Sequence, residues 1–329
     1  MSKPKIAFYW CASCGGCEEA VVDLAEDILP VVEAVDIVFW PVAMDFKKAD
    51  VEVLEDKELA VSFINGAVRS SEQLEMVELL RRKSQIIIAF GSCAHLGGIP
   101  GLANVASREQ VLREAYSLAP SVTNEQGIYP QQNCGVDGNE LTLPSLWHTV
   151  KTLDQVTEVN YYLPGCPPPV KLIAAAIHAI IAGDLPKNGA VLAPDNALCD
   201  ECPHRDSKPE QLGIREFKRP FQVEIDPEQC LLAQGLLCLG SITRSGCDAA
   251  CIGANMPCTG CMGPTSQVKD FGAKALSAIA SVIDAKEERD IDTVFDNIVD
   301  PVGTFYRYSL PASQIHRNYE SQSKGGAKK

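Results

Sequence analysis

The sequence predicts an α/β protein in which a doubly wound parallel sheet is followed by a cysteine-rich domain. In the first half, short apolar, β-branched runs alternate with helical periods, as in parallel sheets covered by helices on both faces. The alternation stops at residues 183–189, where Gly and Pro gather, and residues 190–265 hold eight cysteines with little periodicity. A chain of 329 residues has the length of about two domains, which we place at residues 1–185 and 186–329.

Five apolar runs have the length and composition of buried strands. Most of them lead into a turn that contains Gly or Cys, and their Val, Ile and aromatic residues suit a pleated sheet. The expected strands span residues 5–10, 36–42, 59–68, 85–90 and 159–163.

Apolar residues at helical spacing follow several of these strands. The expected helices span residues 18–29, 71–82 and 170–182, and Ser70 or Ser71 is the expected N-cap of the second. A longer helical period at residues 266–289 has an apolar face that we expect to pack on the body of the protein. The tail at residues 323–329 is expected to be disordered.

Composition limits the partners and the compartment. A net charge of −14 repels phosphate backbones and anionic lipids, so neither nucleic acid nor a membrane is an expected partner. The longest nearly unbroken apolar stretch, residues 172–182, is too short to span a bilayer, and no export signal is visible. We therefore expect a cytoplasmic protein, in which the 14 cysteines favour metal binding over disulfides.

Four cysteines of the first half lie just beyond the carboxyl ends of expected strands. Cys14 and Cys17 follow the first strand, Cys93 the fourth and Cys166 the last. Because these strand ends share one edge of an open parallel sheet, the four thiols can meet in space. Four sulfurs suit either zinc or an iron–sulfur cluster. The flanking glycines favour the cluster, which is bulkier and accepts hydrogen bonds from backbone N–H groups.

The second half contains two further sets of four cysteines. They are Cys199, Cys202, Cys230 and Cys238, followed by Cys247, Cys251, Cys258 and Cys261. Two C-x2-C pairs among them are also typical of a zinc ribbon, which would leave four cysteines unexplained. Two clusters would use all eight, so the count favours clusters and keeps a zinc-organised scaffold as the alternative.

Four motifs occur in order along the chain: C-G-G-C-E-E at 14–19, G-S-C-A-H-L-G-G-I at 91–99, L-P-G-C-P-P at 163–168 and C-I-G-A-N-M-P-C-T-G-C at 251–261. Together they resemble the small, electron-transferring subunit of nickel–iron hydrogenases, over about residues 5–263. The resemblance implies a flavodoxin-like first domain and a C-terminal irregular and helical domain that binds iron–sulfur clusters.

The resemblance also implies three 4Fe–4S clusters and their ligands. The proximal cluster would be held by Cys14, Cys17, Cys93 and Cys166, the distal cluster by Cys199, Cys202, Cys230 and Cys238, and the medial cluster by Cys247, Cys251, Cys258 and Cys261. In the periplasmic branch the first distal ligand is histidine, and proline matches Cys251. Cysteine at both positions allows a 4Fe–4S cluster at each site, and the extra thiolate charge lowers the distal potential.

Within the family, the sequence is most similar to the cytosolic branch, and there to the F420-non-reducing (methyl-viologen-reducing) hydrogenases associated with heterodisulfide reductase. The resemblance implies a hydrogenase subunit without catalytic residues, because the H2-activating NiFe site lies on a large subunit. Electrons would pass from this subunit to an iron–sulfur delta-type subunit and then to the heterodisulfide reductase flavoprotein. These partners would form an electron-bifurcating complex. The gamma subunit of a deazaflavin-coenzyme-reducing hydrogenase is the alternative within the family.

Six other residues have simpler expected roles. Cys11 and Cys134 are expected to be buried or incidental thiols, although Cys11 has the spacing to replace Cys14. Glu18 and Glu19 are expected to be first-turn acids favoured by the helix dipole, with a proton route or a large-subunit contact as the alternative. His95, and His204 near Cys202, are expected to lie behind the ligands or at the surface rather than to bind metal.

Overall fold

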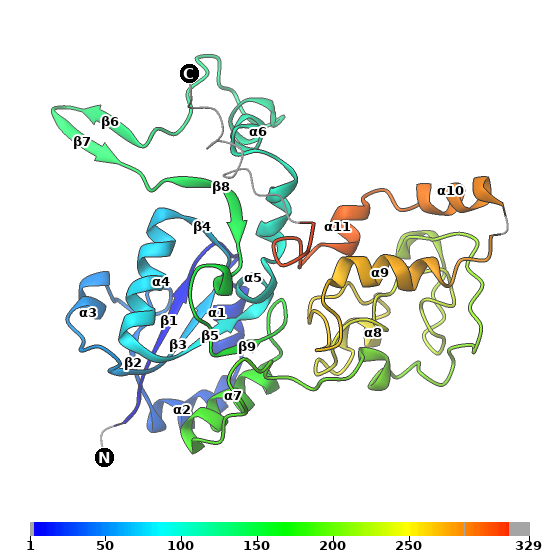
Figure 1. The fold of residues 1–329 in the computed structure, drawn as a ribbon, viewed down its shortest axis with the longest axis horizontal. Helices are drawn as coiled ribbons and strands as arrows, with labels where there is room; N and C mark the ends of the chain where they lie inside the picture. The colour runs from blue at the N-terminus through cyan, green and yellow to red at the C-terminus, as the bar shows by residue number, and fades with distance from the viewer. Residues whose placement is uncertain (1–2, 286, 316–329) are drawn as a thin grey trace.

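The computed structural model describes residues 3–285 and 287–315, and its largest element is a five-stranded parallel sheet (Figure 1). The strands lie in the order β2-β1-β3-β5-β9. Numbered along the chain this is the 2-1-3-4-5 order of flavodoxin-like folds, so the predicted fold class is confirmed. The strands are β1 (Lys5–Trp10), β2 (Asp36–Phe39), β3 (Leu59–Asn65), β5 (Ser84–Phe90) and β9 (Tyr161–Leu163).

Helices cover both faces of the sheet. Along each strand alternate side chains point to opposite faces, so that Phe8 and Phe63 stack in one core while Ala7 and Ile64 lie in the other. The first core is closed by α1 (Gly16–Val22), α2 (Ile28–Ala34) and α7 (Val170–Ala182), and the second by α3 (Lys48–Glu52), α4 (Ser71–Lys83) and α5 (Gly91–Leu96).

Predicted boundaries hold for three elements and fail for others. The strand at residues 5–10, the helix at 170–182 and the Ser70-capped helix from Ser71 are confirmed, and Ser70 accepts a hydrogen bond from the Gln73 N–H. The expected helix over 18–29 is wrong as a single element. It ends at Val22, and Ala25 adopts a φ of 50° in the turn η1 (Ala25–Asp27) that leads into α2.

The expected strand over 59–68 is divided at Gly66. Its φ is 85°, and a Cβ there would lie only 2.7 Å from the carbonyl carbon of Cys11. The chain therefore turns, and β4 (Val68–Ser70) leaves the main sheet to pair with β8 (Leu146–Lys151), which the sequence pattern did not predict.

Beyond α7 regular elements are short. Residues 190–265 contain the turns η5 (Leu198–Asp200) and η6 (Pro220–Gln222) and the single helical turn α8 (Ala250–Gly253). The single helix predicted over 266–289 is wrong. The chain forms α9 (Phe271–Ala280) and α10 (Glu288–Asp296), which are followed by α11 (Pro301–Phe305).

The apolar face of α9 packs as predicted. Phe271, Ala275 and Ile279 are buried in one cluster with Phe305 and Leu310. The tail expected to be disordered, residues 323–329, lies outside the described residues. Among the described residues, no helix combines the length and the apolar composition needed to cross a membrane.

The segment after α11 returns to the first half of the chain. A Cβ on Gly97 would lie 2.2 Å from the Pro311 ring, so the two segments approach closely. The Gly98 N–H donates to the Tyr308 carbonyl at 3.0 Å, and the Gln155 side chain donates to the Pro311 carbonyl at 2.9 Å. The cysteine-rich half is thereby attached to the turn η2 (Ile99–Val105) and to α5.

Residues 106–145, called the arm below, stand away from this body (Figure 1). The arm contains α6 (Arg108–Arg113), the π-helical turn η3 (Glu114–Leu118) and a hairpin of β6 (Asn133–Val136) and β7 (Asn139–Thr142). Among the described residues, none of the arm belongs to a hydrophobic cluster.

Candidate metal centres

The structure brings Cys14, Cys17, Cys93 and Cys166 together at the carboxyl edge of the sheet. Cys17 lies in the first turn of α1, the first helix after β1. Cys93 lies in α5, which begins directly after β5, and Cys166 follows β9. Burial is the main cause that raises the pKa of the Cys17 thiol, and the thiols of the other three cysteines add to it. Burial, with Cys166 and Cys14, likewise raises the pKa of Cys93 to about 12.

Two glycines let the backbone approach these sulfurs. Gly91 has a φ of 83°, and a Cβ there would lie 2.4 Å from the Cys17 Sγ. A Cβ on Gly98, whose φ is 57°, would lie 2.3 Å from the Cys93 Sγ. Since real Cβ contacts are not that short, both positions require glycine, as the glycine-rich motifs indicated.

A second set, Cys199, Cys202, Cys230 and Cys238, lines a compact cavity of about 30 Å³. Leu231, Leu232 and Ile252 form its apolar wall. Burial raises the pKa of the Cys199 thiol to about 11, and the other three thiols add to this effect while Lys208 opposes it. The four thiols therefore lie close enough together to influence one another.

A third set, Cys247, Cys251, Cys258 and Cys261, lines a larger cavity of about 310 Å³. Cys166 of the first set lines the same cavity. Burial raises the pKa of the Cys261 thiol to about 12, and the thiols of Cys247, Cys251 and Cys166 add to it.

The third set contacts both of the others. The backbone N–H of Cys258 donates to the Cys238 sulfur at 3.4 Å. On the other side, the backbone of Cys166 hydrogen-bonds the Cys261 thiol, and the Ser92 hydroxyl donates to the Cys261 carbonyl. In space the sets therefore follow the order first, third, second, which differs from their order along the chain.

Backbone N–H groups surround the sulfurs. The Gly16 N–H donates to the Cys14 sulfur at 3.4 Å, and backbone hydrogen bonds from Gly240 and Gly260 lower the pKa of the Cys238 and Cys258 thiols against the effect of burial. Such bonds favour the thiolate, the form that binds metal. Soft sulfur donors with N–H groups around them fit iron–sulfur clusters. Within residues 3–285 and 287–315, no three His, Cys, Asp or Glu side chains converge on a single-ion site.

The two remaining cysteines lie apart from these sets. Cys11 is buried in the core on the opposite face of the sheet from Cys17, and burial alone raises the pKa of its thiol. Cys134 is exposed on β6 of the arm. The structure thus places Cys14, and not Cys11, beside Cys17, Cys93 and Cys166. All 14 cysteines are free thiols.

Glu18 lies in the first turn of α1, as expected, but its side chain is buried. It is 2% exposed, and it accepts hydrogen bonds from the Trp40 indole and, at 2.6 Å, from Asn65. Burial raises its pKa to about 7, and the two hydrogen bonds oppose the increase. Sequence analysis missed Trp40 and Asn65, although a polar residue at the end of an apolar strand was a detectable signal. Glu19 is exposed, in the first turn of α1.

His95 and Arg244 lie between the two halves of the chain. His95 is half-buried on α5 against the Tyr162 ring, with ring centroids 4.7 Å apart, and desolvation and then Arg244 lower its pKa to about 3. The Arg244 side chain is 4% exposed, pairs with Asp195 at 2.8 Å, and donates to the Pro264 carbonyl at 3.1 Å. Arg244, which the sequence pattern did not single out, thus fastens the segment before Cys199 to the loop of Cys261.

Comparison with known proteins identifies the family. The family described as NADH ubiquinone oxidoreductase, 20 Kd subunit, matches residues 14–180. The iron-sulfur subunit of the F420-non-reducing hydrogenase of Archaeoglobus profundus is 39% identical, over 95% of this chain and 98% of its own length. This chain belongs to the family of F420-non-reducing hydrogenase iron–sulfur subunits.

Further members of this family cover nearly the whole chain. The corresponding F420-non-reducing hydrogenase subunit of Methanothermobacter thermautotrophicus is 37% identical, over 98% of this chain and 99% of its own length. Among solved structures, a chain of the nickel–iron–selenium hydrogenase of Desulfovibrio vulgaris Hildenborough matches with a TM-score of 0.52 and 16% identity, over 80% of this chain and 94% of that chain, which shows the fold alone. The expected family is confirmed, and the chain is a hydrogenase subunit, within an oxidoreductase family.

Proposed function

We propose that this chain relays electrons from H2 oxidation on a nickel–iron large subunit, through three 4Fe–4S clusters, to an iron–sulfur and flavin partner of the heterodisulfide reductase type. One observation carries the proposal: the third cysteine set contacts both others, through Cys258 with Cys238 and through Cys261 with Cys166. A relay needs its redox groups in a row, and this arrangement supplies three four-thiol sites in a row.

We assign all twelve clustered cysteines as ligands. The proximal cluster is assigned to Cys14, Cys17, Cys93 and Cys166, the medial cluster to Cys247, Cys251, Cys258 and Cys261, and the distal cluster to Cys199, Cys202, Cys230 and Cys238. When bound, an iron–sulfur cluster supplies one-electron oxidation and reduction. The donor sets support the assignment, because each brings four thiols together, and the second and third sets line cavities.

In this proposal the protein binds the clusters, shields them from water and holds them in position. The thiolates hold the iron, and backbone N–H groups such as that of Cys258 at the Cys238 sulfur stabilise the negative charge. Buried Leu231 and Ile252 exclude water from the distal set. Glycine at positions 91 and 98 holds the backbone against the proximal sulfurs, which limits their movement during electron transfer.

The exposure of Cys14 and the names of the relatives support the proposed partners. Cys14 is exposed, so the proximal set reaches the surface where an electron donor can approach. The relatives are F420-non-reducing hydrogenases, which favours the heterodisulfide reductase type of acceptor over the deazaflavin-coenzyme-reducing alternative. One of them is named an iron-sulfur subunit, which favours iron over a zinc-organised scaffold. Fourteen free cysteines suit the reducing cytoplasm, where we place the protein.

Metal analysis of the natively and anaerobically purified complex tests the proposal. We expect about twelve irons per chain, four for each cluster, absorbance that bleaches under dithionite, and a nickel-containing larger subunit. Zinc in place of iron, or far less iron, would overturn the cluster assignment. A complex without nickel would overturn the proposed nickel–iron electron source.

The proposed order is tested by Cys251→Pro and Cys199→Ala in the purified complex. If electrons pass the medial and distal sites in turn, each variant lowers the rate of H2-dependent reduction of the partner flavoprotein. Unchanged turnover with every acceptor would contradict the relay.

A further inference from the structure

One carboxylate connects the loop of the second cysteine set to a cysteine of the third. Glu201 belongs to the loop of residues 199–208 and is half-buried. One of its carboxylate oxygens accepts hydrogen bonds from the backbone N–H groups of Gly246 at 2.9 Å and of Cys247 at 3.1 Å. Burial is the main cause that raises the pKa of the Cys247 thiol, and the charge of Glu201 adds to it. A negative charge from the 199–208 loop therefore lies against the third set.

The backbone on either side of this contact is fixed by further hydrogen bonds. The Leu198 N–H donates to the Thr243 carbonyl at 2.7 Å, and the Ser245 N–H donates to the Asn196 carbonyl at 2.9 Å. The side chains of Ser245 and Asn196 also share a hydrogen bond of 2.7 Å. The position of the Glu201 carboxylate is thus set by the pairing of two segments that lie far apart in sequence.

Two other carboxylates close to these cysteines are paired with cations. Asp200 pairs with Arg205 at 3.3 Å, and Asp248 pairs with Lys171. Among the residues that the structure describes, no Lys, Arg or His lies within ion-pair distance of Glu201. Glu201 is therefore a negative charge that no neighbouring cation neutralises.

A positive charge from the same loop faces the second set. Lys208 is exposed, and it lines the cavity that the four thiols of this set share. Burial raises the pKa of the Cys199 thiol, and the charge of Lys208 lowers it. Ser207 holds this end of the loop in place, because its hydroxyl donates to the His204 carbonyl at 2.9 Å and accepts from the Cys230 N–H at 2.8 Å. One loop thus presents charges of opposite sign to two neighbouring cysteine sets.

We propose that Glu201 lowers the reduction potential of the medial cluster and that Lys208 raises the reduction potential of the distal cluster. A reduced cluster carries one more negative charge than its oxidised form, so a nearby carboxylate disfavours reduction and a nearby ammonium group favours it. In the transfer itself one electron leaves the reduced medial cluster and enters the oxidised distal cluster, and no proton moves. The two charges thereby favour transfer toward the distal cluster. This inference rests on the proposed function, in which H2 supplies the electron.

The test is a redox titration of the anaerobically purified complex, followed by electron paramagnetic resonance, which measures the midpoint potential of each cluster without turnover. Glu201→Gln keeps an acceptor oxygen for the Gly246 and Cys247 N–H groups and removes the charge. We expect it to raise the medial midpoint. At a fixed potential the ratio of reduced to oxidised cluster should change about tenfold, which is about 59 mV for one electron.

Lys208→Met should lower the distal midpoint. Its effect should be the smaller of the two, because Lys208 is exposed and solvent ions screen its charge. The medial and distal signals are assigned with Cys251→Pro and Cys199→Ala, each of which changes one site.

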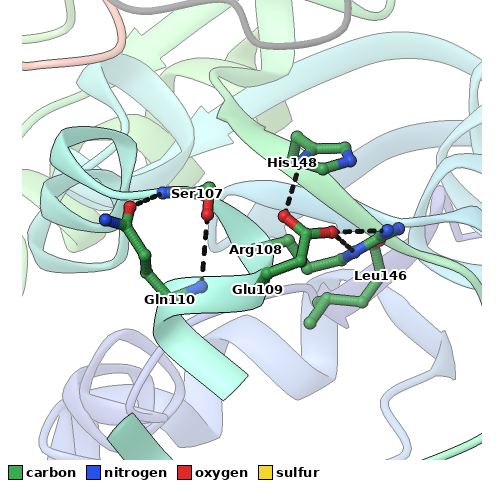
Figure 2. Close-up of polar contacts among 6 residues, drawn as sticks. All are labelled: Ser107, Arg108, Glu109, Gln110, Leu146 and His148. Atoms are coloured by element: carbon green, nitrogen blue, oxygen red, sulfur yellow. Dashed lines mark hydrogen bonds and ion pairs between the residues drawn. The ribbon is translucent and has the colours of Figure 1, made fainter. Parts of the chain in front are cut away.

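Two control variants remove the same charges elsewhere. Glu109→Gln acts in the arm, where the Glu109 carboxylate pairs with Arg108 at 2.8 Å and lies 3.6 Å from His148 (Figure 2). Lys48→Met acts on α3, in the first half of the chain. Neither residue lines the cavity of the medial or the distal set, so we expect both midpoints to stay unchanged.

An unchanged midpoint in either Glu201→Gln or Lys208→Met, at full iron content, would overturn the inference. A loss of iron from Glu201→Gln would also overturn it, because the carboxylate would then be needed to build the site rather than to set its potential. A failure of the proposed function gives a different result, in which H2 produces no cluster signal in the unmodified complex.

Discussion

Asn65, the last residue of β3, donates a hydrogen bond of 2.6 Å to the buried carboxylate of Glu18 in α1. The Trp40 indole donates to the same carboxylate from beyond the end of β2. Since Cys17 directly precedes Glu18, this small network attaches the helix of a proximal thiol to two strands of the sheet. The position of that thiol therefore depends on residues distant in sequence.

Glu18→Ala should destabilise the protein measurably. The change leaves two buried donors, on Trp40 and Asn65, without their acceptor, at a cost of about 1–3 kcal/mol each. Glu18→Gln keeps the side-chain volume and one of the two acceptor oxygens, so it leaves only one of the donors without an acceptor and should cost less. The measurement is the apparent melting temperature of the purified complex. Equal melting temperatures for the two variants would contradict the importance of these hydrogen bonds.

Gly91→Ala should remove iron from the proximal set. The new Cβ would lie 2.4 Å from the Cys17 sulfur, so the thiol or the backbone must move. Gly183→Ala is the control, because Gly183 also has a positive φ, 68°, but a Cβ there would meet no atom within 4 Å. We expect the first variant to lose about four irons per chain and the second to lose none. Iron analysis of both variants tests this prediction, and equal iron contents would refute the steric argument.

Cys14→Ala and Cys11→Ala should differ in their effect on iron, although both cysteines stand three residues before another cysteine. Cys14 lies with the proximal thiols, whereas Cys11 is packed in the core on the other face of the sheet. We therefore expect Cys14→Ala to lose proximal iron and Cys11→Ala to keep it with a modest loss of stability. Cys134→Ala, on the exposed arm, is the neutral control. Iron loss from Cys11→Ala alone would reverse the ligand assignment.

Removal of iron should open the cysteine-rich half selectively. Residues 190–265 have only short helical turns, whereas the first half has a sheet with a core on each face. Limited proteolysis of iron-depleted protein should cut within 190–265 and leave a fragment of about residues 1–185, in line with the proposed division of the chain. Iron-loaded protein should resist under the same conditions. Cleavage that begins within the sheet would contradict this division.

The parallel sheet and the positions of the first four cysteines were predictable, because both depend on local pattern. Apolar runs and helical periods alternate along the first half, and a cysteine that follows a parallel strand must lie at the carboxyl edge. The break at Gly66 was not predictable in the same way. It depends on the close approach of Cys11, a residue 55 positions earlier that only the folded sheet brings near.

The sequence by itself determined the fold class, the family and the grouping of twelve cysteines into sets of four, since spacing and motif order are properties of the chain alone. Only the tertiary structure decided that Cys11 is buried on the opposite face of the sheet from Cys17, and that Glu18 is buried. These relationships arise from contacts between segments far apart in sequence, which no local periodicity encodes.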